Sequence, residues 1–444
     1  MIDGVTTQRP VLILGGGIAG MTTAWELRRL GIPARVIEAT PHLGGRIHTV
    51  REGNGLVETG MQFYYSAYRE TKKLLREVGL LDKLVPIDVR GHLLWDDRVG
   101  TFSKTRPWLT MLSARQNLTL QMSVARQASS LLTMSPFDYR ANDPLDQIDV
   151  GTYFRRWLDE ATYEVAIRPM VNAYAFCEPE GHSLAMVLRI LKLSGIASTH
   201  GLAPGNDALP AALGRHLDVL HARAKHVVIE DGAVSAVVIE RDGVEETLPT
   251  SCVVSALRGP DASKVLGDAP AIAGAMDALP YSTILLANLH LDRPIPGPDW
   301  VYVMSRKAGH HSAFACDLAR RAPVMFDKPN AMIQANFAEP VSTTLLGASD
   351  EDIIAKAISD MQTFLPEVAD WVAHASVVRR PRVLPNFAAG MFDEVRRIEA
   401  MAQRIQGLHL AGDYLRSPLC EGAVRSGLTA VSRIVQPVDR AAAA

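Results

Sequence analysis

The sequence predicts an α/β fold, and two observations support this class. Near the start, the apolar run Val11–Leu14 is followed by a glycine turn, a segment of helical periodicity at 18–30 and a second strand at 33–39. Near the end, a strand at 408–411 is followed by a helix from about 421 to 435. A strand–helix–strand opening and a strand–helix close predict one parallel sheet that is completed from both ends of the chain.

The middle of the chain predicts that this sheet is interrupted by an inserted domain. Four strand-like segments, at 227–230, 233–239, 245–248 and 252–256, are separated by Asp231-Gly232 and by a second Asp-Gly pair, which favour hairpin turns. Residues 100–200 instead show helical patterning with few turn signals. A chain of 444 residues is also too long for one ordinary core, so we expect two domains.

Composition narrows the class of protein further. The apolar fraction of 48%, the charged fraction of 21% and the net charge of −2 indicate a compact globular protein and argue against a general nucleic-acid binder. The four cysteines are scattered with no Cys-x-x-Cys pair, so neither a metal site nor a disulfide framework is predicted. The N-terminus contains an acid and no long apolar run, so we expect a cytoplasmic protein without a spanning helix.

The glycine turn carries the first functional signal. Gly15, Gly17 and Gly20 satisfy G-x-G-x-x-G between a strand and a helix, and Glu38 ends the next strand. This placement predicts a dinucleotide site, with the pyrophosphate at the helix N-terminus and the ribose diol near the carboxylate.

A second glycine motif, Gly44-Gly45-Arg46, follows directly after that strand. Its glycines allow backbone amides to approach phosphate oxygen, and Arg46 supplies a fixed cation. On these residues the sequence resembles the flavin amine oxidase, protoporphyrinogen oxidase and phytoene desaturase superfamily, which implies FAD as the cofactor.

The resemblance extends to the end of the chain, where Gly412-Asp413 and Glu421-Gly422-Ala423 are similar to the closing motif of the superfamily. It implies that Asp413 accepts hydrogen bonds from cofactor hydroxyls and that the last helix directs its positive end towards the flavin. The residues expected to contact FAD are Gly15, Gly17, Ile18, Ala19, Gly20, Glu38, Ala39, Gly44, Gly45, Arg46, Gly60, Met61, Gln62, Val228, Gly412, Asp413, Glu421, Gly422 and Ala423.

The implied architecture is a Rossmann-type FAD-binding domain with an inserted, mixed α+β substrate domain. We expect the FAD-binding domain at 1–98, 206–284 (which includes the strand meander) and 391–444, and the substrate domain at 99–205, where it is helical, and 285–390.

Two positions favour the protoporphyrinogen oxidase and desaturase branches. Amine-oxidase branches carry a lysine on a strand leading into the substrate domain and an aromatic residue before the Glu-Gly-Ala triplet. Our alignment places Leu285 and Leu419 at these positions, so the expected pocket wall is apolar. The family pattern also places Tyr174, Phe176 and Cys177 at the substrate pocket.

These features predict an FAD-dependent oxidase or desaturase that oxidises a hydrophobic small molecule by hydride transfer to flavin N5. Two alternatives remain open, an amine or amino-acid oxidase and a non-redox flavin-dependent isomerase. No catalytic base is assigned. The candidate polar groups are His182, His290, His310 and His311, although a lone histidine is more often structural.

One further segment suggests a partner. Residues 99–137 contain no Asp or Glu, are rich in Leu and Met, and include Lys104, Arg106, Arg115 and Arg126. This composition suits peripheral contact with an anionic membrane surface, and it also suits an ordinary helical packing face.

Overall fold

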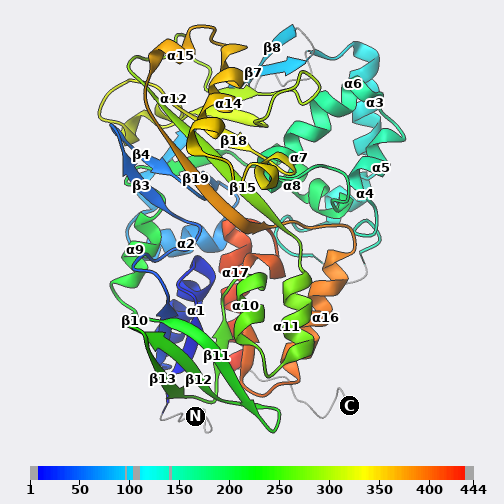
Figure 1. Ribbon diagram of the computed structural model, residues 1–444. Coiled ribbons are helices and arrows are strands. Elements are labelled where there is room, and N and C mark those ends of the chain that lie inside the picture. Colours follow the sequence, from blue (N-terminus) through cyan, green and yellow to red (C-terminus); the bar gives the residue numbers. More distant parts are fainter. Residues whose placement is uncertain (1–8, 96–97, 104–110, 140–142, 436–444) are drawn as a thin grey trace.

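The structure is a computed structural model that describes residues 9–95, 98–103, 111–139 and 143–435. Its lower part in Figure 1 is built on a five-stranded parallel sheet, and its upper part on a seven-stranded mixed sheet. The basic residues Lys104 and Arg106, which were predicted to favour contact with an anionic surface, lie outside the described residues.

The parallel sheet confirms the predicted α/β class. Its order is β10-β2-β1-β14-β20, so strands from the start, the middle and the end of the chain lie side by side. The bounds of its strands are β1 Val11–Leu14, β2 Ala34–Glu38, β10 Asp218–His221, β14 Val253–Ser255 and β20 Leu408–Leu410.

The predicted four-stranded meander needs one correction. Only three of its strands form a separate antiparallel sheet, namely β11 (Arg223–Glu230), β12 (Ala233–Arg241) and β13 (Val244–Pro249). The fourth segment is β14, which pairs in parallel with β1 and β20. All three residues of β14 are buried, as expected for a strand covered on both faces.

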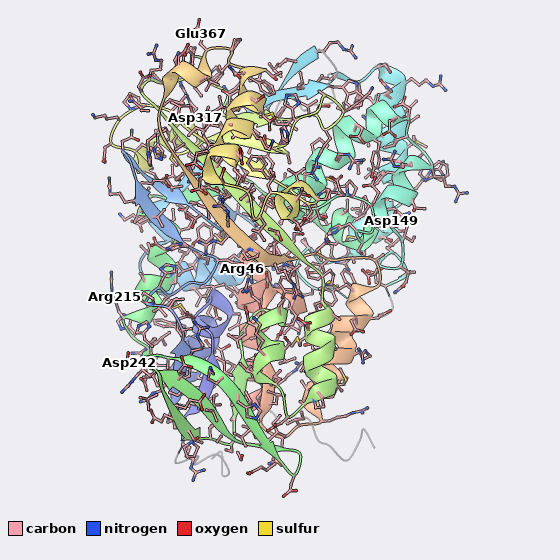
Figure 2. The ribbon with its side chains drawn as sticks, viewed as in Figure 1. Arg46, Asp149, Arg215, Asp242, Asp317 and Glu367 are labelled. Atoms are coloured by element: carbon pink, nitrogen blue, oxygen red, sulfur yellow. The ribbon has the colours of Figure 1, made fainter. Side chains whose placement is uncertain are left out.

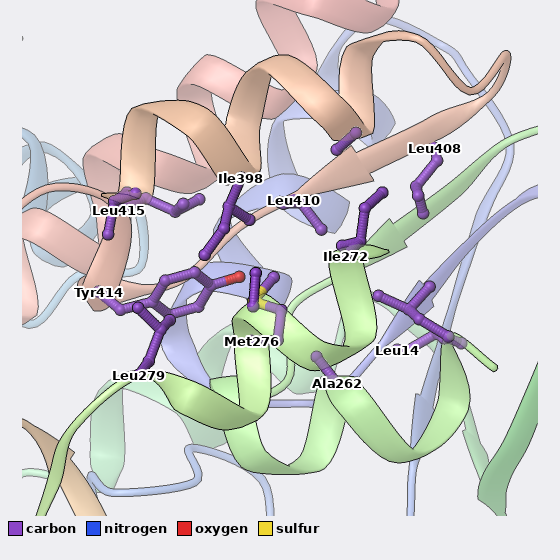
Figure 3. Packing of buried hydrophobic residues seen from close by; sticks show 14 of the residues in the cluster. Leu14, Ala262, Ile272, Met276, Leu279, Ile398, Leu408, Leu410, Tyr414 and Leu415 are labelled. Atoms are coloured by element: carbon purple, nitrogen blue, oxygen red, sulfur yellow. The ribbon is translucent and has the colours of Figure 1, made fainter. Parts of the chain in front are cut away.

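Helices cover both faces of the parallel sheet. Leu12 and Leu14 of β1 pack against α10 (Gly259–Val265), α11 (Pro270–Ala278) and α16 (Met391–Gln403), as Figure 3 shows around Leu14 and Met276. Val11 and Ile13 face the other side, where α1 (Ile18–Arg29) packs against α17 (Cys420–Val435).

Close contact between α1 and α17 depends on a glycine. A Cβ at Gly427 would lie 2.5 Å from the carbonyl oxygen of Ala19. The first and last helices of the described chain therefore touch backbone to backbone, and this contact brings the two predicted cofactor segments together.

The seven-stranded sheet has the order β19-β15-β18-β17-β16-β7-β8. One of its faces is covered by α13 (Val341–Thr344), α14 (Asp350–Gln362) and α15 (Val368–Trp371). Its strands are β7 Arg90–Trp95, β8 Arg98–Ser103, β15 Tyr281–Leu291, β16 Val301–Val303, β17 Phe314–Asp317, β18 Met332–Phe337 and β19 Val372–Pro385.

The strand β7 lies outside the unit in which the sequence analysis placed it. We expected residues 1–98 to form the first part of the FAD-binding domain, but β7 pairs with β16 and β8 in the seven-stranded sheet. Strand pairing across a long stretch of chain decides this membership, and a local pattern does not report it.

The described residues of 111–139 and 143–196 are mostly helical, as the pattern of residues 100–200 predicts, and they lie beside the seven-stranded sheet in Figure 1. Residues 100–103 differ from the prediction, because they belong to β8. No helix of the described residues is long and apolar enough to cross a membrane. The bounds here are α3 Ala114–Ala125, α4 Ala128–Thr133, α5 Val150–Arg155, α6 Glu160–Thr162, the π-helix η3 Tyr163–Ile167, α7 Arg168–Ala175 and α8 Leu184–Ile196.

Short elements connect the two parts of the molecule. The hairpin of β3 (Thr49–Glu52) and β4 (Gly55–Glu58) leads to α2 (Arg69–Glu77). The others are β5 Tyr64–Tyr65, β6 Leu84–Ile87, β9 Thr199–Leu202, α9 Ala208–Gly214, α12 Leu318–Arg321 and the short 3₁₀ turns η1 Leu81–Lys83, η4 Pro323–Met325 and η5 Asp413–Leu415.

Candidate functional site

The glycine turn after β1 leaves open space in front of a helix N-terminus. A Cβ at Gly20 would lie 2.1 Å from the carbonyl oxygen of Gly15, so packing alone requires this glycine. A Cβ at Gly17 would meet nothing within 4 Å. The first turn of α1, where Ile18 and Ala19 lie, has neither a side-chain cap nor an acidic residue. These features fit a pyrophosphate bound at the helix N-terminus.

The second glycine motif adjoins the first. The amide of Gly44 donates to the carbonyl of Gly16 at 2.8 Å, and a bridge pairs Gly17 with Gly44. A Cβ at Gly45 would lie 3.3 Å from the Cα of Gly17, although Gly45 itself is exposed. The two motifs therefore border the same open space with backbone atoms.

The predicted ribose ligand borders the same turn. Glu38 accepts a hydrogen bond from the amide of Gly16 at 2.7 Å and another from the amide of Thr40 at 2.9 Å. Ala39 follows it at the end of β2 and is exposed. Val228, the predicted adenine contact, is a half-buried residue of β11, which lies beside β2.

The structure joins Arg46 directly to Asp413, 367 residues away along the chain. The two guanidinium Nη atoms donate to the two carboxylate oxygens at 2.6 and 2.7 Å, and Nη1 also donates to the carbonyl of Val383 at 3.1 Å. Burial acts to lower the pKa of Arg46, but Asp413 raises it above its ordinary value. In Figure 2, Arg46 lies at the middle of the molecule, between the two parts.

This pair refines the prediction for both residues. Each was expected to contact FAD separately, and the structure shows each satisfying the other's charge in a bidentate, charge-assisted pair. The pair thereby attaches the Gly-Gly-Arg loop to the C-terminal motif, of which Gly412 is also held by the Ser426 hydroxyl at 2.8 Å.

Glu421 is a correction to the predicted site. Its carboxylate accepts hydrogen bonds from the backbone amides of Arg69, Glu70 and Thr71 at 2.9–3.1 Å and from the Thr71 hydroxyl at 2.8 Å. It therefore caps the N-terminus of α2, where a carboxylate is favoured. The side chain is fully buried and its carboxylate is occupied by these donors, so a contact with the cofactor can come only from the backbone of this residue.

The two residues after Glu421, Gly422 and Ala423, form the tightly packed start of α17. A Cβ at Gly422 would lie 2.3 Å from the carbonyl of Ser417, so the chain turns tightly into α17 here. Ala423 is buried in the cluster beneath α1. The backbone at this helix N-terminus remains a candidate for contact with the flavin.

The loop Gly60-Met61-Gln62 is docked on the backbone of Arg46. The amide of Met61 donates to the Arg46 carbonyl at 2.8 Å, and a Cβ at Gly60 would lie 2.0 Å from the same oxygen. The Gln62 amide donates to the carbonyls of Glu58 and Gly60, and its oxygen accepts from Arg321 of α12. Both the backbone and the amide orientation of this loop are thus determined.

Glu58, at the start of this loop, is 1% exposed. Its carboxylate accepts hydrogen bonds from the amide of Asn206 and the hydroxyl of Thr49, each at 2.9 Å. Burial raises the pKa of Glu58 to about 7, although these hydrogen bonds and nearby Arg321 act in the opposite direction.

Two arginines contact the Thr59–Gln62 segment that were not among the site residues predicted from the sequence. Arg321 contacts Gln62, and Arg380 of β19 donates to the hydroxyl of Thr59 at 3.2 Å. The basic run Arg379-Arg380-Pro381-Arg382 is the only sequence signal for Arg380, and it does not report which side chain faces the loop.

The prediction that Leu285 forms part of the pocket wall also needs correction. It is fully buried in the cluster that β15 forms with α14, together with Phe337 and Met361. Side chains alternate along a strand, so it is the half-buried Ile284 that points to the opposite face, towards the loop. Leu419 is half-buried beside the start of α17, as a pocket residue would be.

The other predicted pocket residues form a compact group around His182. The Cys177 sulfur lies 3.8 Å from His182 Nδ1, and the Tyr174 ring packs edge-on against the imidazole. Burial raises the pKa of Cys177 to about 12 and lowers that of His182 to about 4, so both are neutral. Phe176 lies beside Phe314, with ring centroids 5.8 Å apart.

The three remaining candidate histidines have structural partners away from the Gly60-Met61-Gln62 loop. His290 lies 2.9 Å from a carboxylate oxygen of Glu52, His310 contacts Thr363, and His311 contacts Asp360. His310 and His311 hold the loop after β16 against α14. The structure thus does not bring these candidates together with the glycine motifs.

The fold and this backbone-lined site define a flavin-dependent oxidoreductase with FAD as its cofactor. The chain belongs to the flavin-containing amine oxidoreductase family, whose model matches residues 18–435. This membership confirms the predicted superfamily, cofactor and enzyme class.

Individual relatives are more distant. The chain is 24% identical to 15-cis-phytoene desaturase of Solanum lycopersicum, over 98% of this chain and 79% of the relative. A putative protoporphyrinogen oxidase from Exiguobacterium sp. 255-15 shares the fold, with a TM-score of 0.74, 19% identity, and coverage of 97% and 99% of the two chains. Cyclohexylamine oxidase from Brevibacterium oxydans IH-35A has a TM-score of 0.74, 16% identity, and coverage of 96% and 98%.

We predict that Gly17→Val folds but does not retain FAD. A Cβ at this position meets no protein atom within 4 Å, so the valine side chain extends into the space available to pyrophosphate. Overpacking of this kind weakens FAD binding by about ten- to a hundredfold. Flavin absorbance and thermal unfolding of the purified variant measure both effects. Gly20→Val is the contrast, because its Cβ meets backbone and should prevent folding. Full FAD occupancy of Gly17→Val would refute the assignment.

We also predict that Glu58→Gln stabilises the protein at neutral and higher pH. Burial raises the folded pKa from 4.5 to about 7, so the unfolded chain ionises first as the pH rises. The wild-type protein therefore loses up to about 3 kcal/mol of stability between pH 4.5 and 7 through this group. The difference in unfolding free energy between variant and wild type should grow across that range. Glu246→Gln, on the exposed strand β13, should show no such growth.

Proposed function

We propose that this protein is an FAD-dependent oxidase or desaturase whose substrate is a hydrophobic small molecule. When bound, FAD supplies a ring that accepts a hydride from an activated C–H bond. The contribution of the chain is to hold the cofactor, orient the substrate and exclude water. The backbone of Gly17, Gly45 and Gly60 lines the cofactor space, and Glu38 provides a carboxylate for cofactor hydroxyls.

The observation that carries the proposal is the apolar character of two half-buried positions, one on β15 and one directly before α17. Ile284 is the side chain of β15 directed towards it, and Leu419 precedes α17. Neither offers a hydrogen bond or a charge to an amine. An apolar side chain contributes roughly 1.5–3 kcal/mol when a partner excludes water from it, so these residues favour an apolar substrate.

The relatives support the same choice without deciding it. The relative named 15-cis-phytoene desaturase aligns with 98% of this chain, and the putative monoamine oxidase of Mycobacterium tuberculosis aligns with 42%. Solved structures that share the fold are named as amine oxidases as well as a protoporphyrinogen oxidase. An amine or amino-acid oxidase and a flavin-dependent isomerase are therefore outcomes that the test must separate.

Anaerobic stopped-flow reduction of the bound flavin tests the proposal. We expect polyene or porphyrinogen compounds to bleach the flavin at least about tenfold faster than simple primary amines, because burial of apolar surface favours them. Rapid bleaching by benzylamine-like compounds alone would establish the amine oxidase. A substrate converted to a product of unchanged mass would establish the isomerase.

We further propose that the helical segment 111–137 contacts an anionic membrane surface. Leu118 and Met122 lie one turn apart on α3 and are 59% and 52% exposed, and Leu132 of α4 is 82% exposed. This segment contains no acid, and Arg115 and Arg126 provide positive charge. Exposed apolar side chains flanked by basic residues favour insertion at the interface of an anionic bilayer.

Vesicle sedimentation tests this surface. The wild-type protein should bind vesicles that contain phosphatidylglycerol more tightly than vesicles of phosphatidylcholine alone. Leu132→Asp should weaken the binding by about tenfold, because it removes apolar contact and adds repulsion. Val244→Asp, at an exposed apolar position (68%) on the distant strand β13, is the control and should bind as the wild type does. Equal binding by all three proteins would exclude this surface.

A further inference from the structure

Two consecutive arginines on β19 point to opposite faces of the seven-stranded sheet. Arg379 pairs in register with Leu285, and it donates to the carboxylate of Asp350 and the carbonyls of Leu346 and Ala348 on the α13–α14 side. Arg380 pairs with Ile284 and lies on the other face, which is turned towards the loop that precedes Gly60. The alternation of the strand thus separates two like side chains into different environments.

Within the part of the chain that the structure describes, the hydrogen-bond partners of Arg380 are neutral. One of its Nη atoms lies 3.2 Å from the hydroxyl of Thr59 and 3.2 Å from His48 Nδ1. Burial lowers the pKa of His48, which favours the neutral imidazole, and a neutral imidazole brings no negative charge to the arginine. Among the described residues, Arg380 makes no ion pair.

The surroundings of Arg380 leave a positive charge without a counter-ion. Its side chain is about half-buried, and both burial and nearby Arg258 lower its pKa, which means that its charge is destabilised in this state. Arg258 is itself paired with Asp261, and Arg46 with Asp413. A partly buried cation with neutral partners costs free energy unless a negative group joins it.

The position of Arg380 indicates that the negative group belongs to a ligand of the proposed FAD site. Its partners are Thr59, which directly precedes Gly60, and His48, which follows Arg46 by two residues. Three residues further along β19, the carbonyl of Val383 accepts a hydrogen bond from Arg46. Arg380 therefore borders the same junction as the Gly-Gly-Arg loop and the Gly60 loop, both of which surround the FAD site.

We propose that Arg380 is a flavin-binding residue, whose guanidinium lies beside the isoalloxazine ring and stabilises the negative charge that the ring carries when reduced. This inference rests on the FAD site of the proposed function. It places a positive charge directly beside the apolar Ile284, which is the cross-strand neighbour of Arg380. Arg380 would thus stabilise the reduced cofactor, and the adjacent Ile284 would contact the substrate.

The experiment compares Arg380→Gln, Arg380→Lys and Arg379→Gln in the FAD-loaded protein without substrate. Two quantities are measured: the flavin reduction potential, against a reference dye, and the dissociation constant of sulfite, an anion that bleaches oxidised flavin. Arg380→Gln should shift the potential to more negative values and weaken sulfite binding by about tenfold or more, as expected for loss of a charged hydrogen-bond donor. Arg380→Lys should recover most of both.

Arg379→Gln is the matched control, because it removes the same charge one residue away on the opposite face. It should lower thermal stability through loss of the Asp350 pair and leave both flavin quantities unchanged. Equal behaviour of the Arg379→Gln and Arg380→Gln proteins would overturn the proposal. If Arg380→Gln is recovered without FAD, retention of FAD by Arg380→Lys supports the role of charge, and loss in both variants overturns it.

A substrate carboxylate is the competing partner for Arg380. In that case Arg380→Gln would leave the substrate-free potential unchanged and weaken binding of a carboxylate ligand such as benzoate, which overturns the flavin role. The substrate preference in the stopped-flow assay is a separate measurement. A failed apolar preference with shifted potentials would refute the proposed function alone, and the reverse result would refute this inference alone.

Discussion

The site depends on one ion pair, which Arg46 and Asp413 form across almost the whole length of the chain. Arg46 follows the second glycine motif, and Asp413 follows the last strand of the parallel sheet. The same guanidinium also holds the carbonyl of Val383 on β19. The Arg46 guanidinium thereby joins three segments. One lies near the start of the chain, one near its end and one in the seven-stranded sheet. Removal of either charge would leave the other partly buried and unpaired, which is costly.

Around this pair, the proposed cofactor space is bordered mainly by backbone. Gly17, Gly45 and Gly60 each stand where the chain approaches another segment or the open space closely. Charged side chains nearby are largely occupied with holding the protein together, as the capping of α2 by Glu421 shows. Backbone atoms are fixed by the packing of strands and helices, so such a site is already arranged before the cofactor binds.

The two faces of the β15–β19 strand pair carry side chains with different roles. On one face, Leu285 and Arg379 stabilise the packing of α14 and its flanking turn. On the other, Ile284 and Arg380 face the loop that carries Gly60. Because side chains alternate with a period of two, an error of one residue in alignment exchanges these roles. A register irregularity between Ser282 and Ile284 lies at this point of the strand pair.

The sequence by itself determined the glycine motifs, the strand–helix order at both ends and hence the FAD-binding class, because these features are local. Gly20 and Gly44, for example, lie where a Cβ would collide with nearby backbone. The sequence did not reveal that β14 leaves the meander, that Glu421 caps α2, or that Arg380 contacts Thr59 in the loop before Gly60. Those facts depend on pairing between segments hundreds of residues apart. Only the tertiary structure decides which face of a strand meets which neighbour, since burial and charge pairing act across space and leave no periodic trace in one segment.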